Sequence, residues 1–246
     1  MTHRVAIVQS SYIPWKGYFD IIHDVDEFIF LDCVQFTVRD WRSRNRIVTP
    51  NGLLWLSVPA GSKRSRLISE VVLEDPTWQA RHWQTIRHAY SRAPGFRLYR
   101  ELFEELYLGQ TWTSLSRMNQ HMTMRIAREV LGIGTRFTDA GSLAPEGHKL
   151  ELILEIVRKS GATHYLSGPA AQAYIDPARF ESMGVQLEYK SYAHYPEYPQ
   201  AQAPFEHGVS IIDLVFNTGA DAPDYIWGRN ARPAAPATSS QEGAAP

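Results

Sequence analysis

The sequence predicts an α/β fold in which helices flank a mainly parallel sheet and a helical segment is inserted between strands. Short apolar runs alternate along the chain with amphipathic helical patterns, an order typical of parallel sheets. The first apolar run, residues 5–8, ends in a polar and aromatic turn, and a second run, residues 28–31, ends at Asp32. A buried strand that opens into such a turn forms a ligand crevice at the carboxyl edge of an α/β sheet. An ordinary strand-to-helix turn with a core tryptophan is the alternative.

Each further element is predicted from its local pattern. Residues 20–26 form a short helix, and residues 47–58 form a hairpin about Asn51-Gly52, because both residues tolerate positive φ. Residues 68–73 form another strand. A helix starts at Pro76 after Asp75 and stops before Pro94. The remaining elements are helices over 96–108, 114–131, 148–160, 177–183 and 211–216, and strands over 164–166 and 185–189.

Composition predicts one ordinary domain. The chain has 246 residues, of which 44% are hydrophobic and 21% charged, so we expect a single α/β domain over 1–228 with a helical subdomain at about 76–131. Residues 229–246 are rich in Ala, Pro, Ser and Gly and are predicted to be a disordered tail. The net charge of -1 gives no general attraction to nucleic acid or membranes. Neither a signal peptide nor a membrane-spanning run fits, so a cytoplasmic protein is expected.

Cysteine and histidine usage argues against a metal site. The one cysteine, Cys33, excludes an internal disulfide and a cysteine-based metal cluster, and it favours a reducing compartment. The nine histidines show no paired spacing on one helix, so we expect no metal. Because no histidine is near it in sequence, Cys33 fits a small buried thiol better than a nucleophile.

Polar side chains at the ends of the first two strands are the candidate catalytic groups. Gln9 could fix a carbonyl, amide or hydroxyl of a substrate. Asp32 lies at the same sheet edge and could bind an amine or act as a base, and a turn-capping aspartate is the alternative. The neighbouring residues expected to bind substrate are Tyr12, Pro14, Trp15, Gly17, Tyr18 and Gln35.

Residues 39–46 contain four arginines together with Trp41 and Asn45. Alternation at 42, 44 and 46 would place three guanidinium groups on one side of an extended segment, where they could grip a phosphate or pyrophosphate by bidentate hydrogen bonds. Arg44, Asn45 and Arg46 are therefore candidates for substrate binding. Nucleic acid is a rival ligand that the charge balance disfavours, and a solvated strand edge protected by charge is the other alternative.

Two later segments complete the predicted crevice. Ser167 and Gly168 follow a short strand, so they belong to the same sheet edge. His164 and Ser167 are three positions apart and point to opposite faces, which disfavours a Ser-His acyl-enzyme. The stiff aromatic stretch 195–200, with Tyr198 and Gln200, is expected to wall the pocket.

Together these segments resemble the WbqC-like family of bacterial proteins from the first strand to about residue 220. The motifs that carry the resemblance are Gln9-x-x-Tyr12-x-Pro14-Trp15-x-Gly17-Tyr18-Phe19, Asp32-x-x-Gln35-Phe36, Trp41-x-x-Arg44-Asn45-Arg46-Ile47, Asn51-Gly52 with Trp55-Leu56-x-Val58-Pro59, Tyr165-Leu166-Ser167-Gly168, Tyr198-Pro199-Gln200 and Ser210-Ile211-Ile212-Asp213-Leu214. The resemblance implies the tailoring of an amino sugar or related small molecule, by attachment of an amino-acyl or acyl group. The setting it implies is biosynthesis of surface polysaccharides, such as lipopolysaccharide O-antigen, or of secondary metabolites. It transfers no established catalytic residue.

The opening is also similar to nucleotidyltransferase-like, Rossmann-like folds, including pantothenate synthetases. Those proteins use a His-x-Gly-His type turn to stabilise phosphates, whereas Pro14 and Tyr18 stand around Gly17 here, which argues against ATP-dependent adenylation. The first hypothesis is a transferase that joins a nucleotide-sugar or other small-molecule acceptor to a carrier-bound acyl or aminoacyl donor. It implies no evident cofactor beyond a nucleotide or that donor, and a carrier protein as a partner. An ATP-dependent ligase or nucleotidyltransferase and a non-catalytic scaffold are the alternatives.

Overall fold

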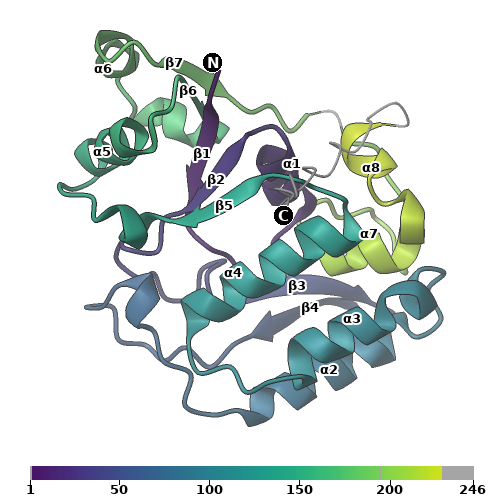
Figure 1. The fold of residues 1–246 in the computed structure, drawn as a ribbon. Helices are drawn as coiled ribbons and strands as arrows, with labels where there is room; N and C mark the ends of the chain where they lie inside the picture. The colour runs from purple at the N-terminus through teal and green to yellow at the C-terminus, as the bar shows by residue number, and fades with distance from the viewer. Residues whose placement is uncertain (1, 194, 229–246) are drawn as a thin grey trace, which may run out of the picture.

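The computed structural model, which describes residues 2–193 and 195–228, contains the parallel sheet that the sequence predicts (Figure 1). The strands are β1 (Arg4–Val8), β2 (Glu27–Phe30), β5 (Arg136–Asp139), β6 (His164–Ser167) and β7 (Gln186–Tyr189). They lie in the order β5-β2-β1-β6-β7, and all neighbouring strands are parallel. β2 lies on one side of β1 and β6 on the other, so the strand order reverses at β1. Open α/β sheets bind ligands outside the carboxyl ends of the strands at such a switch point.

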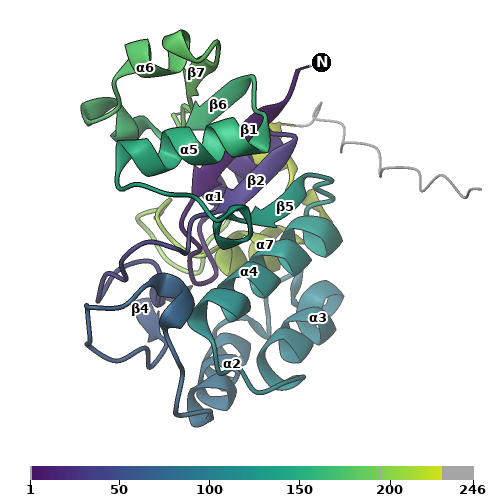
Figure 2. The ribbon, with the colours of Figure 1, turned by 60° about the vertical axis from the view of Figure 1, so that its left-hand side comes forward.

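Helices cover both faces of this sheet because its strands are apolar on both sides. Ala6 and Phe28 pack in one core with α1 (Lys16–His23) and α4 (Leu115–Arg125), whereas Ile7 and Ile29 pack with α5 (Leu150–Ser160) and α6 (Pro177–Ser182). Figure 2 shows α5 and α6 at one end of the molecule and α2 (Thr77–Tyr90) and α3 (Phe96–Leu108) at the other. The predicted α/β architecture with flanking helices is confirmed.

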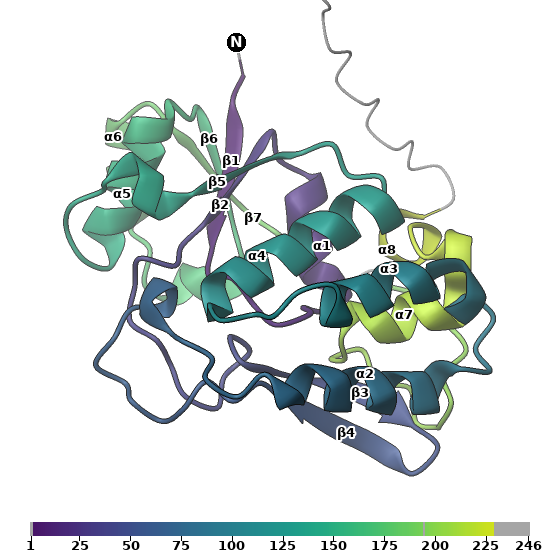
Figure 3. The same cartoon turned by 60° about the horizontal axis from the view of Figure 1, so that its bottom comes forward.

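An antiparallel hairpin and further helices lie below the carboxyl edge of the sheet (Figure 3). The hairpin consists of β3 (Arg44–Thr49) and β4 (Gly52–Ser57), and α2 (Thr77–Tyr90) packs on β3 and on α3 (Phe96–Leu108). α7 (Ile211–Thr218) contacts β3 and α3, and α8 (Asp224–Trp227) contacts α1. The buried side chains of these helices belong to the same hydrophobic cluster as α1 and β2, so the helical segment and this face of the sheet share one core.

Several boundaries differ from the sequence-based expectations. α1 begins at Lys16 rather than Asp20, because extended Trp15 ends the turn earlier. The strand expected at 68–73 is wrong: Ile68–Glu70 is a 3₁₀ helix, and Val72 forms only an isolated bridge with Ser114. In the hairpin, the two residues that connect the strands are 50 and 51, so the turn lies one position before the expected Asn51-Gly52 pair.

Some elements were not predicted at all. β5 contains only one strongly apolar residue, and α8 is a single turn. Within the helix predicted over 114–131, α4 continues as a π-helical segment, Ile126–Val130, and the other 3₁₀ helices are Ala140–Leu143, Pro169–Ala173 and Gly219–Asp221. The predicted tail, 229–246, lies outside the described residues. None of the helices in the described ranges is both long and apolar enough to cross a bilayer.

Candidate functional site

The turn between β1 and α1 is fixed by the hairpin beside it. Asn45, buried on β3, donates its side-chain amide to the main-chain oxygens of Tyr12 (3.1 Å) and Ile13 (2.8 Å). The buried Tyr12 hydroxyl lies 2.8 Å from Nδ1 of His82 and 2.6 Å from the hydroxyl of Tyr107. These contacts hold Ile13 at a φ of 36°, a left-handed conformation that costs energy for a branched residue. The structure therefore places Tyr12 as a support of the turn.

Gly17 provides the space in which the Trp15 indole lies. A Cβ atom added to Gly17 would approach three ring atoms of Trp15 to 2.3, 2.7 and 2.7 Å, so any larger residue would displace the ring. The indole also makes edge-on ring contacts with Tyr192 and Tyr195, with centroid separations of 5.1 and 5.9 Å. Gly17 thus acts through the position of Trp15.

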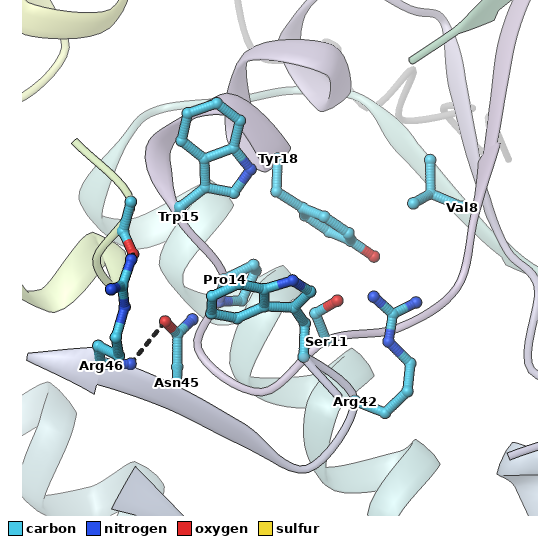
Figure 4. Close-up of a pocket in the computed structure, with 10 residues that line it drawn as sticks. Val8, Ser11, Pro14, Trp15, Tyr18, Arg42, Asn45 and Arg46 are labelled. Carbon is cyan, nitrogen blue, oxygen red and sulfur yellow. Dashed lines mark hydrogen bonds between the residues drawn. The ribbon is translucent and has the colours of Figure 1, made fainter. Parts of the chain in front are cut away.

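A cavity of about 390 Å³, here called the aromatic cavity, opens beside this turn (Figure 4). It is lined by Val8, Ser11, Pro14, Trp15, Tyr18, Trp41, Arg42, Asn45, Arg46 and Gly208. Figure 4 shows the hydroxyls of Tyr18 and Ser11 and the guanidinium of Arg42 on the same side of the cavity. Mostly apolar walls with a few convergent polar groups are typical of a small-molecule site.

Arg42 is the cation at the inner end of this cavity. Its Nη1 donates to Oε1 of Gln9 at 2.6 Å. Its Nε is shielded from solvent and has no hydrogen-bond partner among the described residues. Burial lowers the pKa of Arg42, an effect that Tyr18, Asp40 and Asp32 oppose. A partly buried guanidinium with an unpaired Nε donor suits a phosphate, a carboxylate or a carbonyl oxygen.

The start of α1 adds to this local preference for negative charge. Trp15 is the N-cap residue of α1, lines the aromatic cavity and makes no capping hydrogen bond through its side chain. The first N–H groups of a helix are oriented toward its N-terminal end and favour anions there. Beside them, burial raises the pKa of the Tyr18 hydroxyl well above its usual value, so this group stays neutral and donates to the main-chain oxygen of Gln9 at 3.0 Å.

A second cavity, here called the strand-edge cavity, has a volume of about 480 Å³ and lies between the carboxyl ends of β1 and β6. Its lining includes Gln9 from the end of β1 and Ser167 and Gly168 from the end of β6. Val8, Trp15, Tyr18 and Arg42 line both cavities, so the two meet at these side chains. The crevice therefore occupies the position at which the strand order reverses.

Two further arginines of the segment at 39–46, Arg44 and Arg46, lie on β3 against the β4 residue Trp55. The Arg44 guanidinium is 4.3 Å and the Arg46 guanidinium 5.6 Å from the centroid of the Trp55 ring. Arg46 also donates to the main-chain oxygen of Gly208 at 2.9 Å and lines the aromatic cavity, whereas Arg44 does not. Arg42 precedes β3 and therefore departs from the alternation of Arg44 and Arg46.

Asp32 is completely buried and lines none of the cavities described here. Its Oδ1 accepts from the main-chain N–H of Ser10 at 2.9 Å, and its Oδ2 accepts from Gln120 at 3.0 Å and from the hydroxyl of Ser116. These partners connect the end of β2 to the turn after β1 and to α4. This placement fits the turn-holding alternative better than direct contact with a substrate.

Tyr198 and Gln200 surround the buried carboxylate of Asp213. Oδ2 of Asp213 accepts from Tyr198 at 2.8 Å and from Gln200 at 2.7 Å, and its Oδ1 accepts from Tyr90 at 2.7 Å. Burial raises the pKa of Asp213, while these three hydrogen bonds lower it. The segment around 195–200 is thus anchored to α7, and neither Tyr198 nor Gln200 lines the two cavities.

Lys16 is a buried cation that the sequence patterns did not single out. Its ammonium lies 5.0, 5.2 and 5.5 Å from the ring centroids of Tyr195, Tyr198 and Phe205, and 3.5 Å from the main-chain oxygen of Pro196. Burial lowers its pKa to about 8, which the charge of Asp213 opposes. The aromatic segment that follows β7 is therefore folded over the first residue of α1.

The structure brings together many, though not all, of the sequence-predicted residues. Those that line the two joined cavities are Gln9, Pro14, Trp15, Tyr18, Asn45, Arg46, Ser167 and Gly168. Gln35 is exposed and lines a third cavity next to Cys33, whose pKa is raised by burial. Arg42 and Trp41 were noted only as members of the arginine segment, and nothing in the spacing distinguishes Arg42 from Arg44. In the described parts of the chain, no group of three or more His, Cys, Asp or Glu residues could hold a metal ion.

Comparison with known proteins gives a family and a relative. The model of the WbqC-like protein family matches residues 9–225. "Uncharacterized protein Rv1507c" of Mycobacterium tuberculosis (strain ATCC 25618 / H37Rv) is 40% identical over 225 residues, which cover 91% of this chain and 97% of that relative. No solved structure matches this chain.

Proposed function

The chain belongs to the WbqC-like protein family, and from that premise we propose that it transfers an acyl or aminoacyl group to an amino sugar or a related small molecule. The observation that supports this proposal best is the junction of two cavities at the strand-order reversal. A transferase needs room for two substrates whose reactive ends meet. The shared side chains Val8, Trp15, Tyr18 and Arg42 mark that meeting point.

The aromatic cavity suits the acceptor. Aromatic walls such as Trp15 can stack on the apolar face of a sugar ring, and Ser11 offers a hydroxyl to the hydroxyls of the sugar. Arg46 would hold the phosphates of a nucleotide-linked sugar, which leaves Arg42 at the cavity junction for the reacting carbonyl. The start of α1 adds its own attraction for negative charge.

In the proposed reaction the amine nitrogen of the sugar attacks the carbonyl carbon of a thioester donor. A C–N bond forms, the C–S bond breaks, and the proton released from nitrogen neutralises the departing thiolate. The partly buried guanidinium of Arg42 would stabilise the oxyanion that develops on the carbonyl oxygen. Tyr18 and Gln9 would orient the reacting groups, and Asp32 would stabilise the turn by holding Ser10 without entering the reaction.

The test is turnover with purified protein, nucleotide-linked amino sugars and carrier-bound acyl or aminoacyl donors, followed by mass spectrometry of the sugar. Arg42→Lys should lower kcat/KM by about 10²-fold or more, in line with loss of an oxyanion donor. Arg44→Lys is the matched control and should change it little, because Arg44 stacks on Trp55 outside both cavities.

Two other results would contradict the proposal. Dependence on ATP with release of pyrophosphate would favour the ligase alternative instead. Absence of turnover with any donor, together with normal product formation in cells that carry Arg42→Lys, would favour a scaffold.

A further inference from the structure

The crevice extends past the two joined cavities into a third and larger one, here called the side cavity. Its volume is about 1050 Å³, at the upper end of ligand sites. It lies outside the end of β2, between Cys33 and the start of α5. Gln9, Leu31, Ile153 and Tyr174 line both this cavity and the strand-edge cavity, so the space is continuous.

The walls of the side cavity are aliphatic and its polar groups are neutral or basic. Leu31, Val34 and Leu152 are among its apolar residues, and His148 and Lys149 directly precede α5, with Lys149 as its N-cap residue. Among the described residues, no aspartate or glutamate lines it. An extended chain of alkyl and amide groups fits such a surface better than a second sugar does.

Exposed cations lie on or next to the segments that line the side cavity. Lys149 is exposed and held at a φ of 53°, and exposed Lys63 and Arg64 belong to a loop that is tied to the cavity wall. The tie consists of Gln35, whose side-chain amide donates to the main-chain oxygen of Arg64 at 3.3 Å and whose backbone forms a bridge with Leu67. None of these three cations forms an ion pair with a residue in the described ranges.

We propose that the side cavity holds the phosphopantetheine-type arm of the acyl donor, with its phosphate at Lys149, Lys63 and Arg64. The arm would run between the aliphatic walls, and its thioester would reach Gln9, where the side cavity joins the strand-edge cavity. The identity of the arm as a donor rests on the proposed transferase function. Binding of the arm is a separate property that is measured without turnover.

Cys33 is the natural reporter, because it is the one cysteine of the chain and lines the side cavity. The rate at which iodoacetamide modifies Cys33 is followed by mass spectrometry, at a pH high enough to ionise a thiol whose pKa burial has raised. The probe is the S-methyl thioether of 4′-phosphopantetheine, which lacks a free thiol and cannot transfer a group. At ten times its Kd, the probe should slow modification about tenfold, because about one protein in eleven remains free.

Three controls define the binding mode. The S-methyl thioether of pantetheine, without phosphate, should protect Cys33 less well. The double variant Arg64→Gln, Lys149→Gln should weaken protection by the phosphorylated probe, whereas Arg92→Gln, an exposed arginine in the turn between α2 and α3, should not. A nucleotide-linked amino sugar should leave the rate unchanged. Two further ligands are tested in the same way, the S-methyl thioether of coenzyme A and a phosphopantetheinylated carrier protein. The one that protects Cys33 at the lower concentration identifies the source of the phosphopantetheine arm.

The proposal is overturned if the phosphorylated probe leaves the modification rate unchanged up to its solubility limit, or if removing both cations has no effect on protection. Failure of the transferase function gives a different pattern, in which Cys33 is protected and yet no acyl group is transferred. Turnover without protection would place the donor elsewhere and leave the transferase function standing.

Discussion

Gly17→Ala tests whether the crevice depends on the fit between Gly17 and Trp15. Alanine is normally the better helix former, so this substitution in α1 would ordinarily stabilise the protein by about 0.5–1 kcal/mol. Here the added methyl group would lie 2.3–2.7 Å from three indole atoms. The ring cannot shift freely, because Tyr192 and Tyr195 pack against it.

Overpacking of a well-packed site costs about 1–3 kcal/mol. Subtracting a helix-propensity gain of about 0.5 kcal/mol leaves an expected loss of about 0.5–2.5 kcal/mol in the free energy of unfolding. Gly168→Ala is the matched control, because Gly168 has a φ of -69° and nothing within 4 Å of its added Cβ. That substitution should be neutral or stabilising, by up to about 1 kcal/mol.

Urea denaturation followed by circular dichroism gives both free energies of unfolding. In a Trp15→Ala background the clash partner is gone, so Gly17→Ala should become stabilising by about 0.5 kcal/mol. A Gly17→Ala single variant that is as stable as the Gly168→Ala variant, or more so, would refute the steric reasoning. Equal effects of Gly17→Ala with and without Trp15 would refute it as well.

Three further substitutions test the buried polar groups. The pKa of Lys16 is lowered to about 8, so the unfolded chain keeps this proton to a higher pH than the folded chain does. The stability of the wild type relative to Lys16→Met should therefore rise with pH between about 8 and 10.5, by up to about 1.4 kcal/mol per pH unit. Urea denaturation at several pH values measures this difference, and a difference that does not change with pH would show that burial does not lower the pKa of Lys16. Asp213→Asn should cost about 2–3 kcal/mol, because the amide nitrogen replaces one of two oxygens that each accept two hydrogen bonds, and a change below about 0.5 kcal/mol would contradict the described network. Asp32→Asn should lower stability by a similar amount, about 2–3 kcal/mol, while the remaining folded protein keeps its turnover; lost turnover at unchanged stability would instead indicate a catalytic base.

Sequence patterns predicted those elements whose burial follows a simple period. Residues 5–8 are apolar on both faces, and residues 96–108 bury one side of a helix, so both were located from the sequence. The strand prediction for residues 68–73 was wrong. Ile68, Val71 and Leu73 are buried and Val72 is 57% exposed, a burial pattern that a short 3₁₀ helix followed by an extended link also produces. β5 has no such pattern, since its pairing with β2 positions it at the edge of the sheet.

The candidate site was predictable as a location and less so as a set of contacts. The turn after β1 was identified because apolar, aromatic and glycine residues meet there. The same motif could not separate Trp15, which lines the crevice, from Tyr12, whose ring is buried among α2 and α3 residues. Asp32 likewise ends the expected strand at the expected edge, yet its oxygens are taken up by partners from distant segments. Such choices depend on long-range packing.

The amide of Asn45 has a mechanical consequence. It joins β3 to a turn 33 residues earlier in the chain by two hydrogen bonds, and its oxygen accepts from the N–H of Arg46 at 2.8 Å. The β3 side of the aromatic cavity therefore cannot move away from the turn between β1 and α1 without breaking these hydrogen bonds. A ligand that enters there meets two walls that are already fixed to each other.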